Sequence, residues 1–523
     1  MERLSLYSTR LAQRLSFRRH SRPVPAEHRP VQLLHIGIAL VLTLTGAVVI
    51  VGGILGAAVA WLGLPKSPPV LDTTSLLEII KISLAVVAGI GGAVALVVAY
   101  RKQRLAEEDS HRENTRLYAE RFDKATDKLG SDAPPVRLAG VHALAALADD
   151  WEGGRQMCID VLCAYLRMPP DPEPHADHDP TGHSRWRAMR EVRRTILRLI
   201  ATHLRSTAQP SWSGTDMDFT GVIFDEDANF EGAVFSGGKI SFDGAELSGG
   251  TVSFYEAEFL DGEISFDTAK FSGGLVSFRR ATFSGSYVTF IDATFSGGAV
   301  SFAEAEFTGS PVVFRLAEFP GGEVSFTEAM FSGGFLFFDG TVFSGAKVDF
   351  NGADFSGGSV SPEIRESFGG RVSFASAAFS DGTVSFNEAK FSNDVVSFAQ
   401  ATFPGGEVTF NGAQFSAGEV SFTTAQFSGG TIAFNTADFS GSMVAFAGAE
   451  FAQGTVSFNG AAFSAGSVSF DQAEFSGGVV LLNEPRDWSH PPTGLPDQAP
   501  GLRLPASLNK TRTAPQTGTA PLL

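Results

Sequence analysis

The chain has 523 residues, of which 43% are hydrophobic, and it carries a formal net charge of −17 with a pI of about 5.1. Two cysteines are too few for a disulfide framework, and this excludes a disulfide-stapled protein and favours a reducing compartment. Residues 215–480 hold 33 acidic side chains against nine basic ones, a balance that disfavours direct binding to nucleic acid.

The N-terminal 101 residues have the pattern of a membrane anchor. Residues 1–30 carry seven arginines, and we interpret them as a topology determinant, with contact to anionic lipid head groups as the alternative. Residues 31–64 and 82–100 contain no charged side chain, and each run is long enough to cross a bilayer. We therefore predict a transmembrane hairpin over 31–101. Basic residues flank its outer ends, so both termini are expected in the cytoplasm of a multi-pass inner-membrane protein.

Residues 103–168 follow a helical pattern with internal stop signals. Gly130 ends one predicted helix, and Ser131 or Asp132 caps the next. A flexible loop rich in Pro, Asp and His is expected over 169–184. Metal binding by its histidines is the weaker alternative, because their spacing is neither helical nor that of a hairpin. A basic amphipathic helix over 185–207 is interpreted as a cap, with membrane or nucleic-acid contact as the alternative.

A twelve-residue unit organises the rest of the chain. From Phe242 to Phe475 the pattern aliphatic-x-Phe-x-x-Ala-x-Phe-Ser-Gly-Gly-x recurs twenty times without insertion or deletion. Such a strict period indicates a repeat architecture. Residues two apart lie on one face of a strand, so each unit points an aliphatic–Phe pair and an Ala–Phe pair to one interior. Side chains of the same kind then stack from coil to coil, which predicts a β-solenoid over 211–482.

The predicted core consists of the aliphatic, Phe and Ala positions of every unit. Representative members are Val252, Phe254, Ala257, Phe259, Phe266, Phe271, Phe398, Ala401, Phe403, Val420, Phe422 and Phe427.

The links between strands bear on the size of one turn. Two residues between Phe and Ala suffice for a right-angle corner but not for a reversal across a sheet spacing of about 10 Å. If the Ser-Gly-Gly-x link also turns the chain by a quarter, one turn needs two units. We therefore favour about 24 residues per turn, which is two repeat units, with a single unit per turn as the alternative.

The run Phe398-Ala-Gln-Ala401-Thr-Phe403, in which Ala stands two residues before Phe, resembles the bacterial pentapeptide-repeat family. The resemblance implies a mainly β fold, a right-handed, four-sided parallel β-helix. The chain departs from the family's plain pattern because Ser-Gly-Gly stretches every second spacing to seven residues. The segment that starts at Arg121 and runs through Leu129-Gly130-Ser131 resembles the helical region that precedes the repeats in membrane-anchored members, and it also looks HEAT-like. The resemblance implies a docking or capping role.

Two stretches of the chain do not follow the repeat pattern. Pro362, Arg365 and Ser367 fall on inward positions, so a local bulge is expected there. Sequence drift in a repeat that tolerates substitutions explains this irregularity more simply than a binding site does. Residues 483–523 are rich in Pro, Thr and Ala and are predicted to be a disordered tail, apart from a cap contact by Trp488.

No motif for catalysis, a cofactor or a metal emerges from the sequence. Walker loops, Gly-x-Ser-x-Gly and zinc-ligand spacings do not occur, and the outward acids are scattered round the coil. We expect a non-enzymatic membrane-anchored scaffold that presents an acidic rod to an unidentified cytoplasmic protein. The alternative, implied by the family resemblance, is a DNA-mimicking modulator of a DNA topoisomerase.

Overall fold

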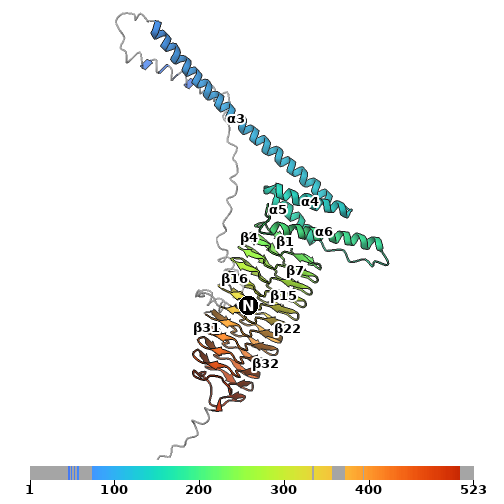
Figure 1. Cartoon of the computed structure of the whole chain (residues 1–523), viewed down its shortest axis with the longest axis vertical. Coiled ribbons are helices and arrows are strands. Elements are labelled where there is room, and N and C mark those ends of the chain that lie inside the picture. Colours follow the sequence, from blue (N-terminus) through green and yellow to red (C-terminus); the bar gives the residue numbers. More distant parts are fainter. Residues whose placement is uncertain are drawn as a thin grey trace, which may run out of the picture. The chain divides into compact units, whose positions relative to one another are not determined.

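The computed structural model describes residues 73–332, 335–355, 372–392 and 394–506, together with seven residues between 45 and 57. The chain divides into two compact units, Met1–Arg116 and Leu117–Leu523. Helices and the stacked strands that follow them are drawn in Figure 1. The first predicted apolar span, 31–64, lies outside the described residues except for those seven.

Helix α3 runs without a break from Thr73 to Leu129. It contains the second predicted apolar span, 82–100, and continues into the charged stretch that the sequence analysis treats as a separate helix. No Pro or Gly and no capping side chain follows Tyr100, so nothing stops the helix there. Within the part of the chain that the structure describes, none of the helices has both the length and the apolar character needed to cross a membrane.

Three helices follow α3 and share one apolar core. They are α4 (Pro134–Asp150), α5 (Arg155–Arg167) and α6 (Pro180–Leu204), with a short 3-10 turn at Glu152–Gly154 before α5. Val141, Leu144, Ile159, Leu162 and Ile196 are fully buried between them. This group of helices, together with the end of α3 from Leu117, is called the helical cap below.

Helix α6 begins earlier than the predicted residue 185. Asp179 caps it by accepting a hydrogen bond from the backbone N–H of Gly182 at 2.8 Å, and Pro180 occupies the first helical position. Part of the predicted flexible loop therefore belongs to the helix.

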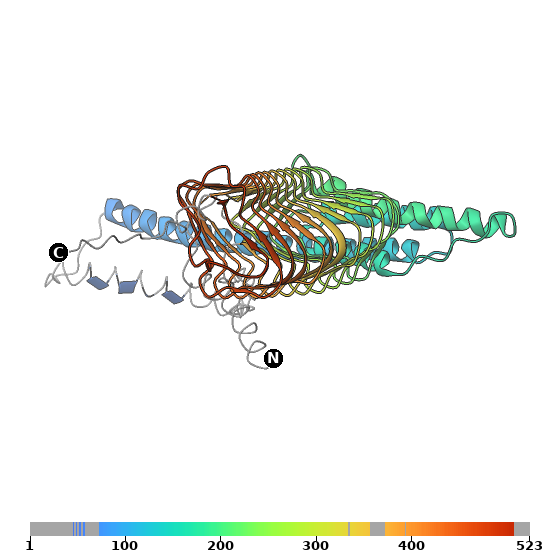
Figure 2. The same ribbon diagram turned by 90° about the horizontal axis from the view of Figure 1, so that it is seen from below.

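The strands from β1 (Met217–Asp218) to β40 (Leu502–Arg503) form a parallel β-solenoid with four short strands per turn. One turn comprises β9 (Glu263–Ser265), β10 (Lys270–Phe271), β11 (Leu275–Ser277) and β12 (Thr282–Ser284). Val276 of β11 pairs with Val252 and with Val300, which stand two repeat units before and two after it. The prediction of two units per turn is thus confirmed, and the sheet that contains β9 has 11 strands, one from each turn, among the described residues. Figure 2 shows the stacked turns from below.

Two kinds of corner join the strands. At the two-residue corner, the N–H of Ala257 donates to the carbonyl of Phe254 at 3.1 Å, and Glu256 between them has φ 53°. Positive φ recurs at this position in most turns, usually in residues other than Gly. At the other corner coils approach closely: a Cβ on Gly429 would lie 2.1 Å from the carbonyl oxygen of Pro404. Gly is therefore required there by packing.

The ladder skips one repeat unit at a single place. Asp354 pairs with Lys390 and Leu336 pairs with Val372, and the members of each pair are three units apart rather than two. Twelve of the residues between Phe355 and Val372 are therefore surplus to the coil. The predicted bulge at Pro362, Arg365 and Ser367 falls in this interval and lies outside the described residues.

The C-terminal end of the solenoid is covered, and here the structure differs from the predicted disordered tail. The N–H groups of Phe463 and Phe470 donate to the carbonyls of Asp487 and Thr493, and β40 (Leu502–Arg503) pairs with β39 (Val479–Leu481). The last coil exposes N–H groups that need acceptors, and residues 483–506 supply them whatever their composition. Residues 507–523 lie outside the described part.

Candidate functional site

The residues chosen from the sequence as core markers line the interior of the solenoid. All twelve are at most 1% exposed. The ring of Phe254 stacks on that of Phe278 in the next coil, with centroids 4.8 Å apart and planes 3° from parallel. Phe266 meets Phe278 edge to face at 5.8 Å within the same layer. The interior is thus filled by ordered aromatic stacks, so any binding function has to lie on the outer surface.

Several of the basic side chains on the coil are paired with acids of a neighbouring coil. Nζ of Lys347 lies 2.7 Å from Oε1 of Glu323, and Nζ of Lys239 lies 3.0 Å from Oε1 of Glu263. Arg280 contacts Glu256 at 3.2 Å. All of these side chains are about half exposed, so each pair contributes about 1 kcal/mol or less. Because acids greatly outnumber bases over residues 215–480, these pairs cannot neutralise the coil, and its surface potential is negative.

An asparagine column runs along one two-residue corner. The N–H of Asn411 donates to Oδ1 of Asn387 at 2.8 Å, and the N–H of Asn435 donates to Oδ1 of Asn411 at 3.1 Å. Asn459 donates to Asn435 at 3.2 Å. Each side chain thus binds the backbone of the next coil, which is a structural role. This column was not predicted from the sequence, although Asn recurs in every second unit from Asn387 onward.

On the other two-residue corner the corresponding position holds Asp339 in one turn, with Arg315 and Ala375 in the turns on either side. Ser373 Oγ donates to Oδ1 of Asp339. Burial raises the pKa of the Asp339 carboxyl to about 6, and the hydrogen bonds from Ser373 and from the N–H of Ala375 only partly oppose this. Asp339 is therefore a partly buried acid in a position that uncharged Asn fills on the other corner.

The basic helix α6 is bound to the first coil through its arginines. Arg190 contacts Asp225 at 2.9 Å and Glu226 at 2.6 Å, and only 17% of its side chain is exposed. Arg193 donates to the carbonyls of Leu166 and Met168, and Arg194 contacts Glu226 at 3.0 Å. Three of the arginines considered for membrane or nucleic-acid contact are thus occupied within the protein. These contacts agree with the interpretation of this helix as a cap.

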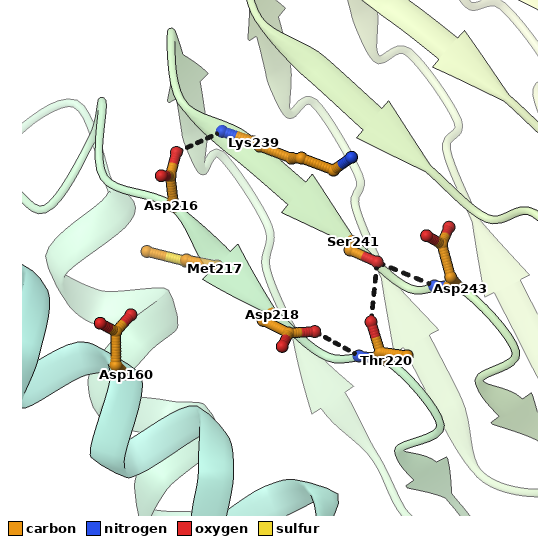
Figure 3. A pocket seen from close by; sticks show the side chains of 8 residues that line it. All are labelled: Asp160, Asp216, Met217, Asp218, Thr220, Lys239, Ser241 and Asp243. Carbon is orange, nitrogen blue, oxygen red and sulfur yellow. Dashed lines mark hydrogen bonds between the residues drawn. The ribbon is translucent and has the colours of Figure 1, made fainter.

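A pocket of about 350 Å³ lies between α5 and the first two coils. Its eight lining residues are drawn in Figure 3 and are Asp160, Asp216, Met217, Asp218, Thr220, Lys239, Ser241 and Asp243.

The charged groups of the pocket already have partners. Asp216 accepts a hydrogen bond from the N–H of Lys239 at 2.7 Å, and Asp218 accepts one from the N–H of Thr220 at 3.0 Å (Figure 3). Arg167 also contacts Asp218 at 2.7 Å. Burial opposes ionisation of Asp218, but the hydrogen bonds from Thr220, aided by Arg167, hold its pKa below the usual value. The pocket is therefore an ion-paired joint between cap and coil, with no nucleophile placed beside a free base.

The segment predicted as a histidine-rich loop, whose last residues form the start of α6, is held by contacts within the chain. His183 stacks on Trp186 with centroids 5.6 Å apart, and the indole N–H of Trp186 donates to the carbonyl of Asp171 at 3.0 Å. Among the residues that could be placed, no three His, Cys, Asp or Glu side chains are grouped so that they could hold a metal ion.

A further cluster, which the sequence analysis did not single out, joins the cap to the coil. Oδ1 of Asp149 in α4 accepts a hydrogen bond from the indole N–H of Trp212 at 2.9 Å, and its Oδ2 lies 3.3 Å from Nε2 of His203 in α6. No local motif connects these three residues, which lie up to 63 positions apart in the sequence.

Comparison with known proteins identifies the repeats. Residues 219–262 match the family model described as pentapeptide repeats (9 copies). The match covers the first coils and not the helices before them. No curated protein matches the chain.

Proposed function

We propose that this protein, a pentapeptide-repeat β-solenoid, is a non-enzymatic scaffold that is anchored in a membrane and presents its acidic coil to a protein partner in the cytoplasm. The observation that carries the proposal is the accessible surface of the solenoid. Its interior is filled with stacked rings, the helical cap closes its first coil, and residues 483–506 close its last coil. Only the lateral surface is left for binding, and that surface is acidic.

The membrane anchor is supported by the apolar side chains of α3. Leu96 is 73% exposed and Ile82 is 62% exposed. Apolar helix surface of this kind is stable in lipid and unfavourable in water. The flanking cluster of Arg101, Lys102 and Arg104 favours a cytoplasmic location for the residues that follow.

The acidic surface indicates the chemistry of the partner. A rod of 11 turns with coils spaced by about 4.8 Å is roughly 50 Å long. A rigid acidic surface of that length attracts a basic protein surface and speeds its association at low ionic strength. Binding is therefore expected to weaken as salt is added.

The test combines fractionation with crosslinking. Full-length protein is expected in the membrane pellet after alkaline extraction, whereas a variant without residues 31–101 is expected in the supernatant. A tag at the C-terminus should resist protease in intact cells and be cut after lysis. Crosslinking in membranes followed by capture should recover one basic protein whose yield falls in high salt. Full-length protein in the supernatant would contradict the anchor, and a tag cut in intact cells would contradict the sidedness.

The alternative, a DNA mimic that modulates a topoisomerase, is favoured only by the acidic charge of the coil. A supercoiling assay with full-length protein separates the two functions. Inhibition or protection of the topoisomerase by this protein, at a concentration near that of the enzyme, would favour the DNA-mimic function over the scaffold function.

A further inference from the structure

Helix α6 presents different side chains on its two sides. Ile196 and Ile200 are fully buried in the core of the helical cap. On the side opposite Ile196, arginines recur at intervals of seven and four residues, a spacing that keeps side chains on one face of a helix. They are Arg187, Arg194 and Arg198, and they are called the arginine stripe below.

The arginine stripe is open to solvent. Arg187 is exposed and makes no hydrogen bond or ion pair with the residues that the structure describes. Arg198 is also exposed, and its Nη2 has one long contact, at 3.5 Å, with the uncharged Oγ1 of Thr195. Arg194 contacts Glu191 and Glu226, yet 52% of its side chain stays exposed. The stripe therefore offers guanidinium groups to a ligand outside the protein.

The charge of α6 is opposite to that of the coil beside it. The helix holds six arginines and the single acid Glu191. Residues 215–480 hold 33 acidic side chains against nine basic ones. Because α6 covers the first coils (Figure 1), positive charge is concentrated at this end of the solenoid and negative charge along its sides.

The spacing of the arginine stripe indicates a flat anionic surface as its ligand. Arg187 and Arg198 are eleven residues apart, which is about 16 Å along a helix. A guanidinium binds phosphate oxygens through paired N–H donors, but one small phosphate cannot bridge that distance. The phosphate groups of neighbouring lipids at a bilayer surface can contact all three arginines at once, and the attraction adds with each one.

A bilayer also suits the charge of the rest of the molecule. When α6 faces the lipid, the acidic coil can extend away from it, and at physiological salt charges farther than about 8 Å from the surface are largely screened. A second copy that offered its acidic coil to the stripe would instead bring two acidic coils together, and a nucleic acid lying beside the coil would be repelled by it. The charge distribution thus favours a lipid surface over these two polyanions.

We propose that the arginine stripe of α6 binds the phosphate groups of anionic lipids and holds this end of the solenoid at the membrane while the coil extends into the cytoplasm. Arg190 pairs α6 with Asp225 and Glu226 of the first coil, so fixing the helix on the membrane also fixes the direction of the rod. The inference rests on the proposed membrane anchor, which brings α6 near a bilayer, and it adds a second contact with that bilayer.

Arginine footprinting of the full-length protein tests this contact. The protein would be reconstituted into vesicles of phosphatidylcholine, alone or mixed with phosphatidylglycerol, and treated with phenylglyoxal, which modifies accessible arginines. By mass spectrometry, Arg187 and Arg198 should react about fivefold more slowly in the anionic vesicles, and high salt should abolish the difference. Arg486, which is 57% exposed near the other end of the solenoid, is the internal reference and should react equally in both.

Paired substitutions assign the effect to the arginine stripe. Arg187→Gln combined with Arg198→Gln should remove most of the slowing at Arg194. The control, Arg185→Gln combined with Arg315→Gln, removes the same charge from positions outside the stripe and should retain the slowing. All four substituted side chains are exposed, so both variants are expected to fold. Slowing at Arg194 that survives the first pair, or that both pairs remove equally, would contradict the proposal.

Failure of the anchor and failure of the arginine stripe give different results. Full-length protein that does not float with phosphatidylcholine vesicles would contradict the anchor. Protein that floats, but whose stripe reacts at the same rate in both kinds of vesicle, would overturn the stripe proposal. Equal slowing by inorganic phosphate or duplex DNA added to the neutral vesicles would also overturn it, as would slowing there that grows with protein concentration, because the ligand would then be free phosphate, nucleic acid or a second copy.

Discussion

The ring of Phe355 stacks on the ring of Phe391 with centroids 5.1 Å apart, although three repeat units separate them in the chain. Away from this interval, stacked rings of neighbouring coils in the regular repeat are two units apart, as Phe398 and Phe422 are. The coils on the two sides of residues 356–371 therefore already pack against each other.

Deletion of residues 359–370 should consequently preserve the fold. The deletion joins Phe355-Ser356-Gly357-Gly358 to Arg371-Val372, which restores the Ser-Gly-Gly-x link of the other units. We expect the thermal midpoint to stay within about 2 °C of that of the parent, because the strands and rings on the two sides of the interval already pair with each other. A control deletion of the same length, residues 395–406, removes half a turn of paired strands and should lower the midpoint by far more. Circular dichroism melts of both proteins would decide.

The second prediction concerns the pH dependence contributed by Asp339. The pKa of this carboxyl in the folded protein is about 6, which is raised above its usual value by burial. A raised pKa means that the folded state binds the proton of Asp339 more tightly than the unfolded state does. The stabilisation that this proton gives is therefore complete below about pH 4 and is lost as the pH rises through about 6.

Asp339→Asn should remove that dependence. At neutral pH the variant is expected to be more stable by an amount on the order of 2 kcal/mol, and the gain should vanish near pH 4. Urea unfolding at about pH 4 and about pH 7 measures both values. Asp292→Asn, at an exposed corner position, serves as the control. A gain of equal size at the two pH values would contradict the argument.

The third prediction concerns the aromatic stacks. Phe398 lies 4.8 Å from Phe374 and 4.7 Å from Phe422, which are the rings above and below it. Phe398→Ala should cost about 3–5 kcal/mol in unfolding free energy, since a large cavity opens between two coils. Gln400→Ala, on the exposed corner of the same coil, should change stability by less than about 0.5 kcal/mol. Similar denaturant midpoints for the two variants would mean that the stacks do not hold the solenoid together.

The fourth prediction separates two reasons for glycine. Gly412 has φ +68° and only ordinary van der Waals neighbours around its Cβ position, whereas Gly429 has ordinary φ and a Cβ position that collides with the backbone of Pro404. Gly412→Ala should cost about 1 kcal/mol, the usual penalty for a left-handed residue. Gly429→Ala should cost clearly more, because backbone atoms of two coils have to move apart. Thermal melts of the two single variants give the comparison.

The sequence alone was sufficient to predict the solenoid, its interior and the length of its turn. Each unit repeats the same inward side chains at the same spacing. The alternation of inward and outward residues along each strand and the stacking of coils therefore predict the same interior residues. The family match to residues 219–262 agrees with that analysis.

Only the tertiary structure shows where the strand pairing skips a repeat unit and how the ends of the solenoid are covered. The twelve-residue period continues in the sequence through Pro362, so it cannot show that the ring of Phe355 stacks on the ring of Phe391. That contact depends on which coils pack best against each other. Likewise, nothing in the composition of residues 483–506 shows that they accept hydrogen bonds from the last coil. The contact of His203 with Asp149 and Trp212 joins three distant segments through side chains that no period relates. Periodic patterns encode contacts that repeat, whereas ends, interruptions and joints are single contacts between segments, and these are settled only when the chain has folded.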